Sequence, residues 1–138
     1  MASMRPELST KNKYWIERHR FYELKHFCLQ YKDWKKTYSM LHDMGLSKTT
    51  ISALPKSDDV IDLTASCAIK KAEYGNRIKM LESAALETDP DLWFYIVKAV
   101  TEGLSYTQMK MQYDIPCSRD TYYDRYRRFF WLLNQYRN

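Results

Sequence analysis

Glycine and proline are scarce in this chain, and their scarcity restricts its fold more than any other feature. Only three glycines and four prolines interrupt its 138 residues. Apolar residues recur at three- and four-residue spacing over long stretches, and no sustained alternation of apolar and polar residues, the pattern of strands, is present. We therefore predict an all-α protein: a helical bundle with a C-terminal helix-turn-helix and a long central helix.

The C-terminal part of the chain carries the clearest helix signals. Asp89 is a good N-cap, and Pro90 suits a first helical turn, where its missing N–H is not needed. Gly103 ends this helix in the usual C-terminal manner. Ser105 or Thr107 can then cap a second, shorter helix. The buried side of that helix is expected to hold Leu104, Met109 and Met111.

A turn separates the short helix from the last one. Asp114 favours a turn, and Pro116 biases Ile115 away from the α region. Ile115 is the lone aliphatic residue of the turn, so we expect it to point inward as a wedge between the two helices. Ser118 caps the final helix. Helical spacing places four of its residues on one apolar stripe: Tyr122, Tyr126, Phe129 and Leu133.

The opposite side of the last helix is polar and rich in arginine. Its N-terminal end carries Arg119, Asp120, Tyr123, Asp124 and Arg127, with Arg125 and Arg128 on the flanks. A short helix, a turn with a buried aliphatic residue and a helix that bears arginines are typical of a helix-turn-helix that reads the major groove of DNA. The alternative is an ordinary packing hairpin whose arginines form a solvated face.

The preceding residues predict a helical platform. Its expected elements are a helix from about Thr10–Asn12 to Tyr31, a helix capped by Asp33 and ended by Gly45, a loop over 45–58, and a long helix from Asp58 or Asp59 to Glu87. The apolar residues of the long helix step by three, four or seven, so it forms either the spine of a monomer or a coiled-coil seam between two copies. They are Val60, Leu63, Cys67, Tyr74, Ile78, Leu81 and Ala85. The chain then divides into a hairpin with its loop, a connecting helix and a helix-turn-helix unit, over residues 1–57, 58–88 and 89–138.

Charge and cysteine content limit the classes of function. The net charge is +5, which permits a polyanionic partner without requiring one. The three cysteines are isolated and have no metal-ligand spacing with the histidines, so neither a disulfide framework nor a metal site is predicted. Catalytic and phosphate-loop motifs are missing, so we expect no enzyme and no cofactor. Without a secretory segment or a long uncharged apolar run, we expect a cytoplasmic protein without membrane contact.

Two stretches of the chain resemble regulators of late genes encoded by phages and prophages of Gram-positive bacteria, of the RinA/ArpU type. They read KYWIERHRFYELKHFCLQYKDWKK and IPCSRDTYYDRYRRFFWLL. The resemblance implies a DNA-binding regulator, active at the nucleoid of a bacterial host cell, whose C-terminal helix-turn-helix is similar to region 4 of sigma factors. By position it implies these DNA-reading residues: Ser118, Arg119, Asp120, Thr121, Tyr123, Asp124 and Arg127. Asp120 and Asp124 depart from the expected chemistry, since carboxylates repel phosphate unless they pair with Arg127 and Arg128 or accept from cytosine N4.

The candidate residues differ in their expected roles on double-stranded DNA. Arg119 and Arg127 would contact bases or nearby phosphates, and Tyr123 would touch a thymine methyl group or a phosphate. Contacts to the DNA backbone are expected from Lys110, Arg125 and Arg128. If about five phosphates are neutralised, log affinity falls with log salt at a slope of roughly −4 to −5.

Two other functions fit the same sequence. A small terminase subunit also combines a helix-turn-helix with oligomerising helices, and a ring of many subunits would favour it over a monomeric or dimeric regulator. A protein-interaction module that binds RNA polymerase or a host factor would use four aromatic residues as its patch: Trp93, Phe94, Phe130 and Trp131. The last two lie beside the apolar stripe, so they alternatively pack on the first helix or across a dimer.

Overall fold

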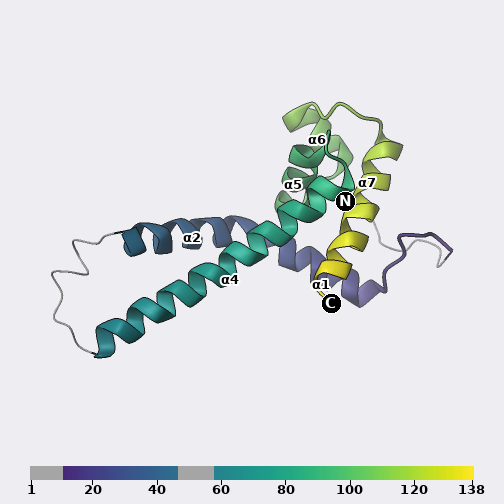
Figure 1. Cartoon of the computed structure of the whole chain (residues 1–138). Helices are drawn as coiled ribbons and strands as arrows, with labels where there is room; N and C mark the ends of the chain where they lie inside the picture. Colours follow the sequence, from purple (N-terminus) through teal and green to yellow (C-terminus); the bar gives the residue numbers. More distant parts are fainter. Residues whose placement is uncertain (1–10, 47–57) are drawn as a thin grey trace. The chain divides into compact units, whose positions relative to one another are not determined.

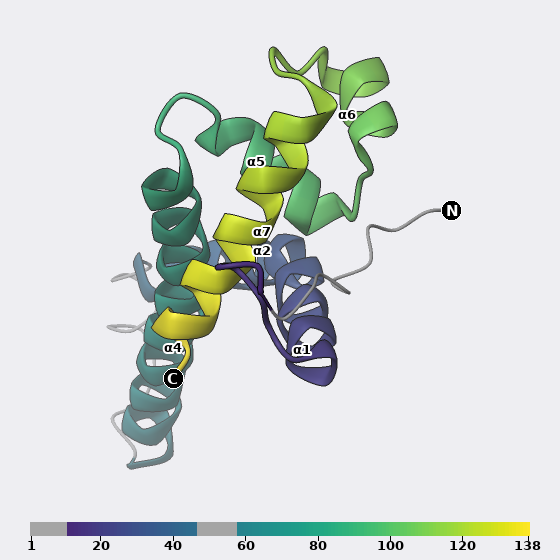
Figure 2. The ribbon, with the colours of Figure 1, turned by 90° about the vertical axis from the view of Figure 1, so that its right-hand side faces the viewer.

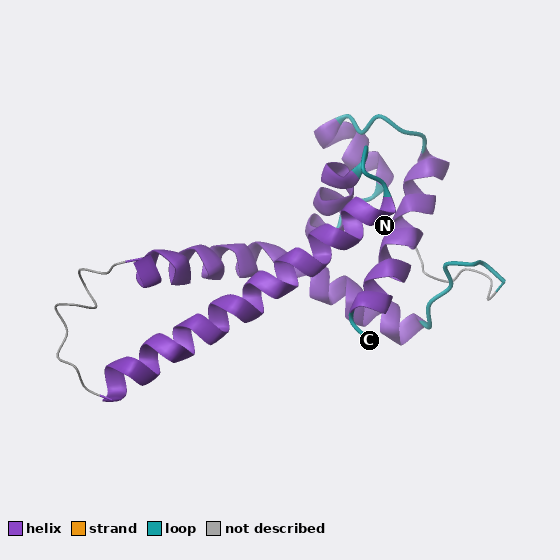
Figure 3. Cartoon of the chain, in the orientation of Figure 1, coloured by secondary structure: helices purple, strands orange, loops and turns teal. Residues whose placement is uncertain are grey.

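The computed structural model describes residues 11–46 and 58–138. Within these ranges the regular structure is helical and no strand occurs (Figure 3). The helices are α1 (Arg18–Leu29), α2 (Tyr31–Leu46), α4 (Asp58–Thr88), α5 (Trp93–Glu102), α6 (Tyr106–Tyr113) and α7 (Arg119–Tyr136) (Figure 1). The all-α prediction is therefore confirmed, and α4 is the predicted long helix. Most of the predicted loop, residues 47–57, lies outside the described residues.

Packing divides the chain into two compact units. The first unit comprises the described part of Met1–Tyr31 together with Met80–Asn138, and so contains α1, α5, α6, α7 and the C-terminal end of α4. The second unit, Lys32–Lys79, contains nearly all of α2 and the remainder of α4 as far as these are described. The division predicted from sequence, into residues 1–57, 58–88 and 89–138, is based on motifs, whereas the two units are defined by packing. The three-part division therefore stays a prediction.

The core of the first unit lies between α1, α5 and α7, which pack on one another, while α6 packs on α5 and α7 (Figure 2). Aromatic rings from α1 and α7 meet at its centre: the ring centroid of Phe130 lies 5.0 Å from that of Phe21 and 4.9 Å from that of Tyr126. Because α7 is covered by both α1 and α5, its buried face is broad. Three members of the predicted apolar stripe are buried there: Tyr122, Phe129 and Leu133.

The burial of Phe130 corrects one candidate for an exposed partner patch. Phe130 is 1% exposed and packs on Phe21 of α1, so its place in that patch is wrong and the alternative, packing on the first helix, is confirmed. Trp131 is partly buried, with its ring 5.8 Å from that of Tyr14. Of the four aromatic residues proposed for the patch, Trp93 and Phe94 remain well exposed.

The first helix starts later than predicted. It begins at Arg18, because the preceding residues form local turns instead of helix. The side chain of Asn12 accepts a hydrogen bond from the N–H of Tyr14 (2.8 Å), which competes with helical backbone bonding. Glu17 then caps the helix by accepting from the N–H of Arg20 (3.1 Å). These two side-chain contacts fix a boundary that apolar spacing does not reveal.

Three expectations about helix ends and faces are also wrong. Helix α2 begins before Asp33 and continues past Gly45, so neither residue has its predicted capping role. Met111 is 81% exposed, although it was predicted on the buried side of α6. Helix α6 spans only two turns, and Met109 is its one buried residue.

The second unit is held by contacts between α2 and α4 near Gly75. A Cβ atom at Gly75 would lie 3.0 Å from Cε2 of Tyr38, so the missing side chain lets the tyrosine ring approach the helix backbone. The Nζ atom of Lys71 lies 2.8 Å from Nδ1 of His42 and 5.4 Å from the centroid of the Tyr38 ring. The predicted seam is half-buried at Cys67, Tyr74 and Ile78, and the side chains of Val60 and Leu63 lie outside the described residues. The choice between a spine and a dimer seam stays a prediction.

Candidate nucleic-acid interface

A small hydrophobic core joins α5, α6 and the start of α7. Its buried members are Ala99, Met109, Ile115 and Tyr122. Ile115, from the turn between α6 and α7, is 1% exposed, which confirms its predicted place as an inward wedge. Asp114 ends α6 in a left-handed conformation (φ 50°) that aspartate tolerates. Lys110 braces the same turn, because its Nζ donates to the carbonyl oxygen of Ile115 (3.2 Å) and lies 3.3 Å from the Asp114 carboxylate.

Predicted caps fix the helix ends around this core. Gly103 closes α5 in the left-handed region (φ 67°). Ser105 and Gln108 form a capping box at the start of α6: the N–H of Ser105 donates to Oε1 of Gln108 (2.9 Å), and the N–H of Gln108 donates to Oγ of Ser105 (3.3 Å). Ser118 caps α7 by accepting from the N–H of Thr121 (3.2 Å). The predicted roles of Gly103 and Ser118 are therefore confirmed, and of the two alternatives for the cap of α6, Ser105 and Thr107, the structure has Ser105.

The predicted cap of α5 is displaced by one turn. Helix α5 begins at Trp93, and Asp89 instead closes the turn that precedes it. One carboxylate oxygen of Asp89 accepts from the N–H groups of Asp91 (3.0 Å) and Leu92 (3.3 Å). Asp89 therefore does not cap α5; its side chain satisfies backbone N–H groups in the turn between α4 and α5.

Tyr106 links α6, the following turn and α7, although no spacing rule predicted its role. Its hydroxyl donates to the carbonyl oxygen of Cys117 (2.8 Å), and its backbone N–H donates to the hydroxyl of Tyr123 (3.4 Å). The guanidinium of Arg119 lies 5.5 Å from the centroid of the Tyr106 ring, and its Nη2 donates to Oγ1 of Thr107 (3.4 Å). Arg119 is thus oriented by α6 while it stays exposed.

The first turn of α7 projects from this core. The N-cap residue Ser118 and the first two residues of the helix, Arg119 and Asp120, are exposed. Four further predicted reading residues are partly buried: Thr121, Tyr123, Asp124 and Arg127. Successive spacings of four and three place Asp120, Asp124 and Arg127 on one side of the helix, which we call the outer face of α7.

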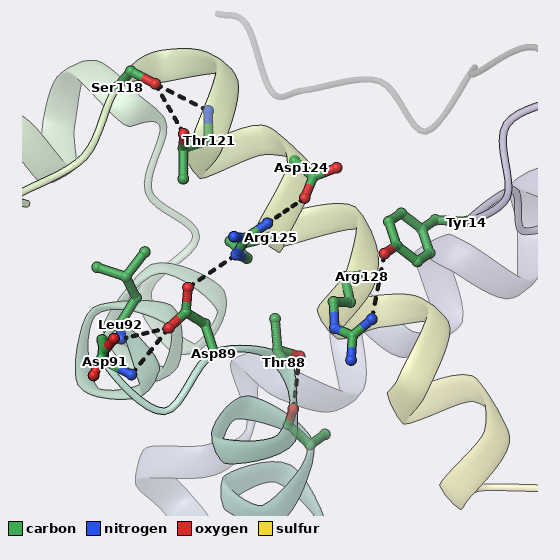
Figure 4. A network of polar contacts seen from close by, with 11 residues as sticks. Tyr14, Thr88, Asp89, Asp91, Leu92, Ser118, Thr121, Asp124, Arg125 and Arg128 are labelled. Atoms are coloured by element: carbon green, nitrogen blue, oxygen red, sulfur yellow. Dashed lines mark hydrogen bonds and ion pairs between the residues drawn. The ribbon is translucent and has the colours of Figure 1, made fainter.

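Arg125 is half-buried and connects α7 to the α4–α5 turn (Figure 4). Its Nε lies 2.9 Å from Oδ2 of Asp89, and its Nη1 donates to Oδ2 of the neighbouring Asp124. Sequence reasoning predicted Arg125 as a contact to the DNA backbone. For Asp124 it left two alternatives open, pairing with Arg127 and Arg128 or acceptance of a hydrogen bond from cytosine N4. The residue that holds Arg125, Asp89, was identified from sequence only as a helix cap.

The acid and base of this contact stabilise each other's charged forms. Burial of the Asp89 carboxylate acts to raise its pKa, but the hydrogen bond from Arg125 and those from the N–H groups of Asp91 and Leu92 outweigh it, so the pKa of Asp89 is lowered. The hydrogen bond to Asp89 likewise raises the pKa of Arg125. Both groups are therefore charged throughout the neutral range.

The remaining basic candidates differ in how far the protein itself engages them. Arg128 donates through Nη1 to the hydroxyl of Tyr14 (3.3 Å) (Figure 4). Arg127 is partly buried, and its Nε finds no hydrogen-bond partner among the described residues. Lys110 braces the turn between α6 and α7. Of the predicted cations, Arg119 is therefore the most exposed one at the leading end of α7.

Comparisons of the chain with protein-family models, with curated proteins and with solved structures found no match. None of the helices described here has both the length and the apolar character that crossing a membrane requires. Within the described ranges, no three His, Cys, Asp or Glu side chains gather in a way that would hold a metal ion.

Proposed function

We propose that this chain binds double-stranded DNA in a sequence-specific manner and regulates transcription, with α7 as the helix that enters the major groove. The observation that best supports this is the exposed first turn of α7, Ser118–Asp120, which projects from a core that buries Tyr122 of the same helix. A major groove about 12 Å wide admits an α-helix. Helices α6 and α7 with their connecting turn would then act as a helix-turn-helix.

Arg119 is the residue best placed to read a base. Its guanidinium is oriented by the Tyr106 ring and by the hydroxyl of Thr107, so it loses less conformational freedom when it binds. Arginine donates two parallel hydrogen bonds to O6 and N7 of guanine, the commonest specific contact in the major groove. We therefore expect Arg119 to select a guanine.

Fewer cations are available for phosphate than the five expected from sequence. Lys110 and Arg125 donate to carbonyl and carboxylate groups of the protein itself. With Arg119 assigned to a base, Arg127 and Arg128 remain for the DNA backbone. About two neutralised phosphates give a slope of log affinity against log salt of roughly −2, shallower than −4 to −5.

Binding titrations of the full chain with duplexes selected from a random pool test this proposal. We expect Arg119→Ala to reduce the discrimination between selected and scrambled duplexes by about 1–3 kcal/mol, because a base contact is lost. Arg18→Ala is a matched control, since Arg18 is also exposed and lies 5.9 Å from a tyrosine ring centroid, but in α1. Equal losses for both duplexes with Arg119→Ala, or equal effects of the two variants, would contradict the assignment.

The similarity of residues 13–36 and 115–133 to RinA/ArpU-type regulators makes control of phage late genes the specific form of the proposal. A small terminase subunit would use the same helices to bind packaging DNA. Assembly separates the two, because a ring of many subunits supports packaging and a monomer or dimer supports transcription. Size-exclusion chromatography with light scattering measures the mass of the assembly and so gives the number of subunits directly.

A protein-interaction module is the second candidate function. The observation that favours it is the exposed aromatic pair at the start of α5, where Trp93 is 40% exposed and Phe94 47% exposed. Such a pair suits a contact with RNA polymerase or with a host factor, because aromatic residues are enriched in protein interfaces. If the full chain binds no duplex even at low salt, this candidate replaces the first.

A further inference from the structure

The Asp124 carboxylate is held in place by a relay of charged groups (Figure 4). Its Oδ2 accepts from Nη1 of Arg125, whose Nε lies 2.9 Å from Oδ2 of Asp89. Asp89 is anchored in turn by the backbone N–H groups of Asp91 and Leu92. The side chain of Asp89 is 16% exposed and that of Arg125 35% exposed, whereas that of Asp124 is 43% exposed. The relay therefore runs from a half-buried anchor to a carboxylate at the surface.

This relay addresses the electrostatic problem of an acid on a helix that faces DNA. A free carboxylate there repels phosphate, but Arg125 offsets part of the charge of Asp124. Arg127 and Arg128, three and four residues further along α7, add positive charge beside it. Since Arg125 occupies Oδ2, the other carboxylate oxygen of Asp124 is the one that can accept a further hydrogen bond.

We propose that Asp124 is a base-reading residue that accepts a hydrogen bond from the exocyclic amino group of cytosine, and that Arg125, anchored by Asp89, is the residue that positions it. This inference rests on the proposed binding of DNA by α7. Cytosine is favoured because its major-groove edge offers the N4 amino donor, whereas adenine places the N7 acceptor beside its own amino group, where it would oppose a carboxylate. Asp124 thus adds a second specificity contact to the one assigned to Arg119.

Removal of the Asp124 side chain has different expected effects if Asp124 reads a base and if it is only a solvated acid. If Asp124 is only a solvated acid, its removal lowers repulsion and tightens binding to every duplex alike. If it reads cytosine, its removal abolishes a preference at one base pair and leaves the other positions unchanged. Measurements on four duplexes that differ at a single pair therefore decide between the two.

The experiment uses the full chain, first in a selection from random duplexes and then in titrations of the four single-pair variants. The wild-type chain should prefer cytosine at one position by about tenfold, and Asp124→Ala should remove that preference alone. Asp124→Asn should shift the preference toward adenine, because an amide both donates to N7 and accepts from N6. Asp33→Ala, which removes an exposed acid on α2, outside the proposed interface, should keep the cytosine preference.

Arg125→Gln tests the positioning role separately. It should weaken the cytosine preference while it leaves the slope of log affinity against log salt unchanged, since Arg125 itself touches no phosphate. A slope lower by about one phosphate would show a direct backbone contact and overturn the positioning role. Circular dichroism should confirm that each variant is folded.

Two further outcomes distinguish a failure of the role of Asp124 from a failure of DNA binding. If the wild-type chain binds duplex with a base preference and Asp124→Ala tightens all four duplexes equally, or leaves the preference intact, the role of Asp124 is overturned and DNA binding stands. If the wild-type chain binds no duplex at low salt, DNA binding and the role of Asp124 fall together.

Discussion

The two compact units of this chain differ in how they bury apolar side chains. In the first unit, Phe129, Phe130 and Leu24 are at most 1% exposed, and rings from α1 and α7 pack edge to face. Among the described residues of the second unit, Trp34 is the single buried hydrophobic side chain, while Met40 and Ile69 are more than half exposed. One unit is thus organised by a core, and the other by a few half-buried contacts.

This difference in burial indicates which unit can hold a DNA-reading helix rigidly. Each fully buried aromatic or aliphatic side chain contributes about 1.5–3 kcal/mol, so the first unit carries most of the hydrophobic stabilisation that the described residues provide. A helix that reads DNA must be held rigidly, and α7 belongs to that unit. The contacts of Tyr38, Lys71 and His42 in the second unit give less stabilisation because they are partly exposed.

The largest effect is expected from emptying the core of the first unit. Phe130→Ala should lower the free energy of unfolding by about 3–5 kcal/mol, because it removes a ring that packs on Phe21 and Tyr126 and leaves a cavity. Chemical denaturation followed by circular dichroism measures the loss. Tyr38→Ala is the comparison in the second unit, and it should cost clearly less. If both substitutions lower the free energy of unfolding by the same amount, the two units do not differ in how strongly their cores stabilise them.

A smaller effect is expected from the contact between Asp89 and Arg125. Asp89→Asn should lower the free energy of unfolding by about 1–2 kcal/mol at neutral pH, because the amide keeps the backbone contacts but loses the charge-assisted bond. The pKa of Asp89 is lowered in the folded protein from its ordinary value of about 3.8, so its contribution is complete above that pH. The contribution disappears as the pH falls through the lower folded pKa.

Thermal unfolding of the wild-type chain and Asp89→Asn across pH therefore sharpens this prediction. The difference in stability between them should be constant from pH 5 to pH 7, roughly one unit above the ordinary pKa of aspartate, and should shrink in stronger acid. A difference that grows toward low pH would contradict the direction of the pKa shift.

The smallest effect is expected in the second unit at Gly75. Gly75→Ala gains about 1 kcal/mol of helix propensity but places a Cβ atom 3.0 Å from Cε2 of Tyr38, so the two effects should nearly cancel. In a Tyr38→Ala background the same substitution should stabilise the protein by about 1 kcal/mol, because the obstacle is gone. If the gain is the same in both backgrounds, the Tyr38 ring does not press on Gly75.

The amino-acid sequence by itself determined the helices and most of their ends near the site. Gly103 and Ser118 have their predicted capping roles, Ser105 is one of the two caps predicted for α6, and Ile115 is buried as predicted. These features depend on hydrogen bonds and backbone angles within about four residues, or on a single apolar residue in a polar turn. Sequence reasoning therefore recovers them without knowledge of the packing.

Only the tertiary structure decided which arginines the protein itself engages. Arg125 meets Asp89 across 36 positions of the chain, and Arg128 meets Tyr14 across 114. The support of Arg119 by Tyr106 likewise depends on how α6 packs on α7. Helical periodicity assigns a residue to a face but not to a partner, because the partner depends on which helix the hydrophobic core brings alongside that face.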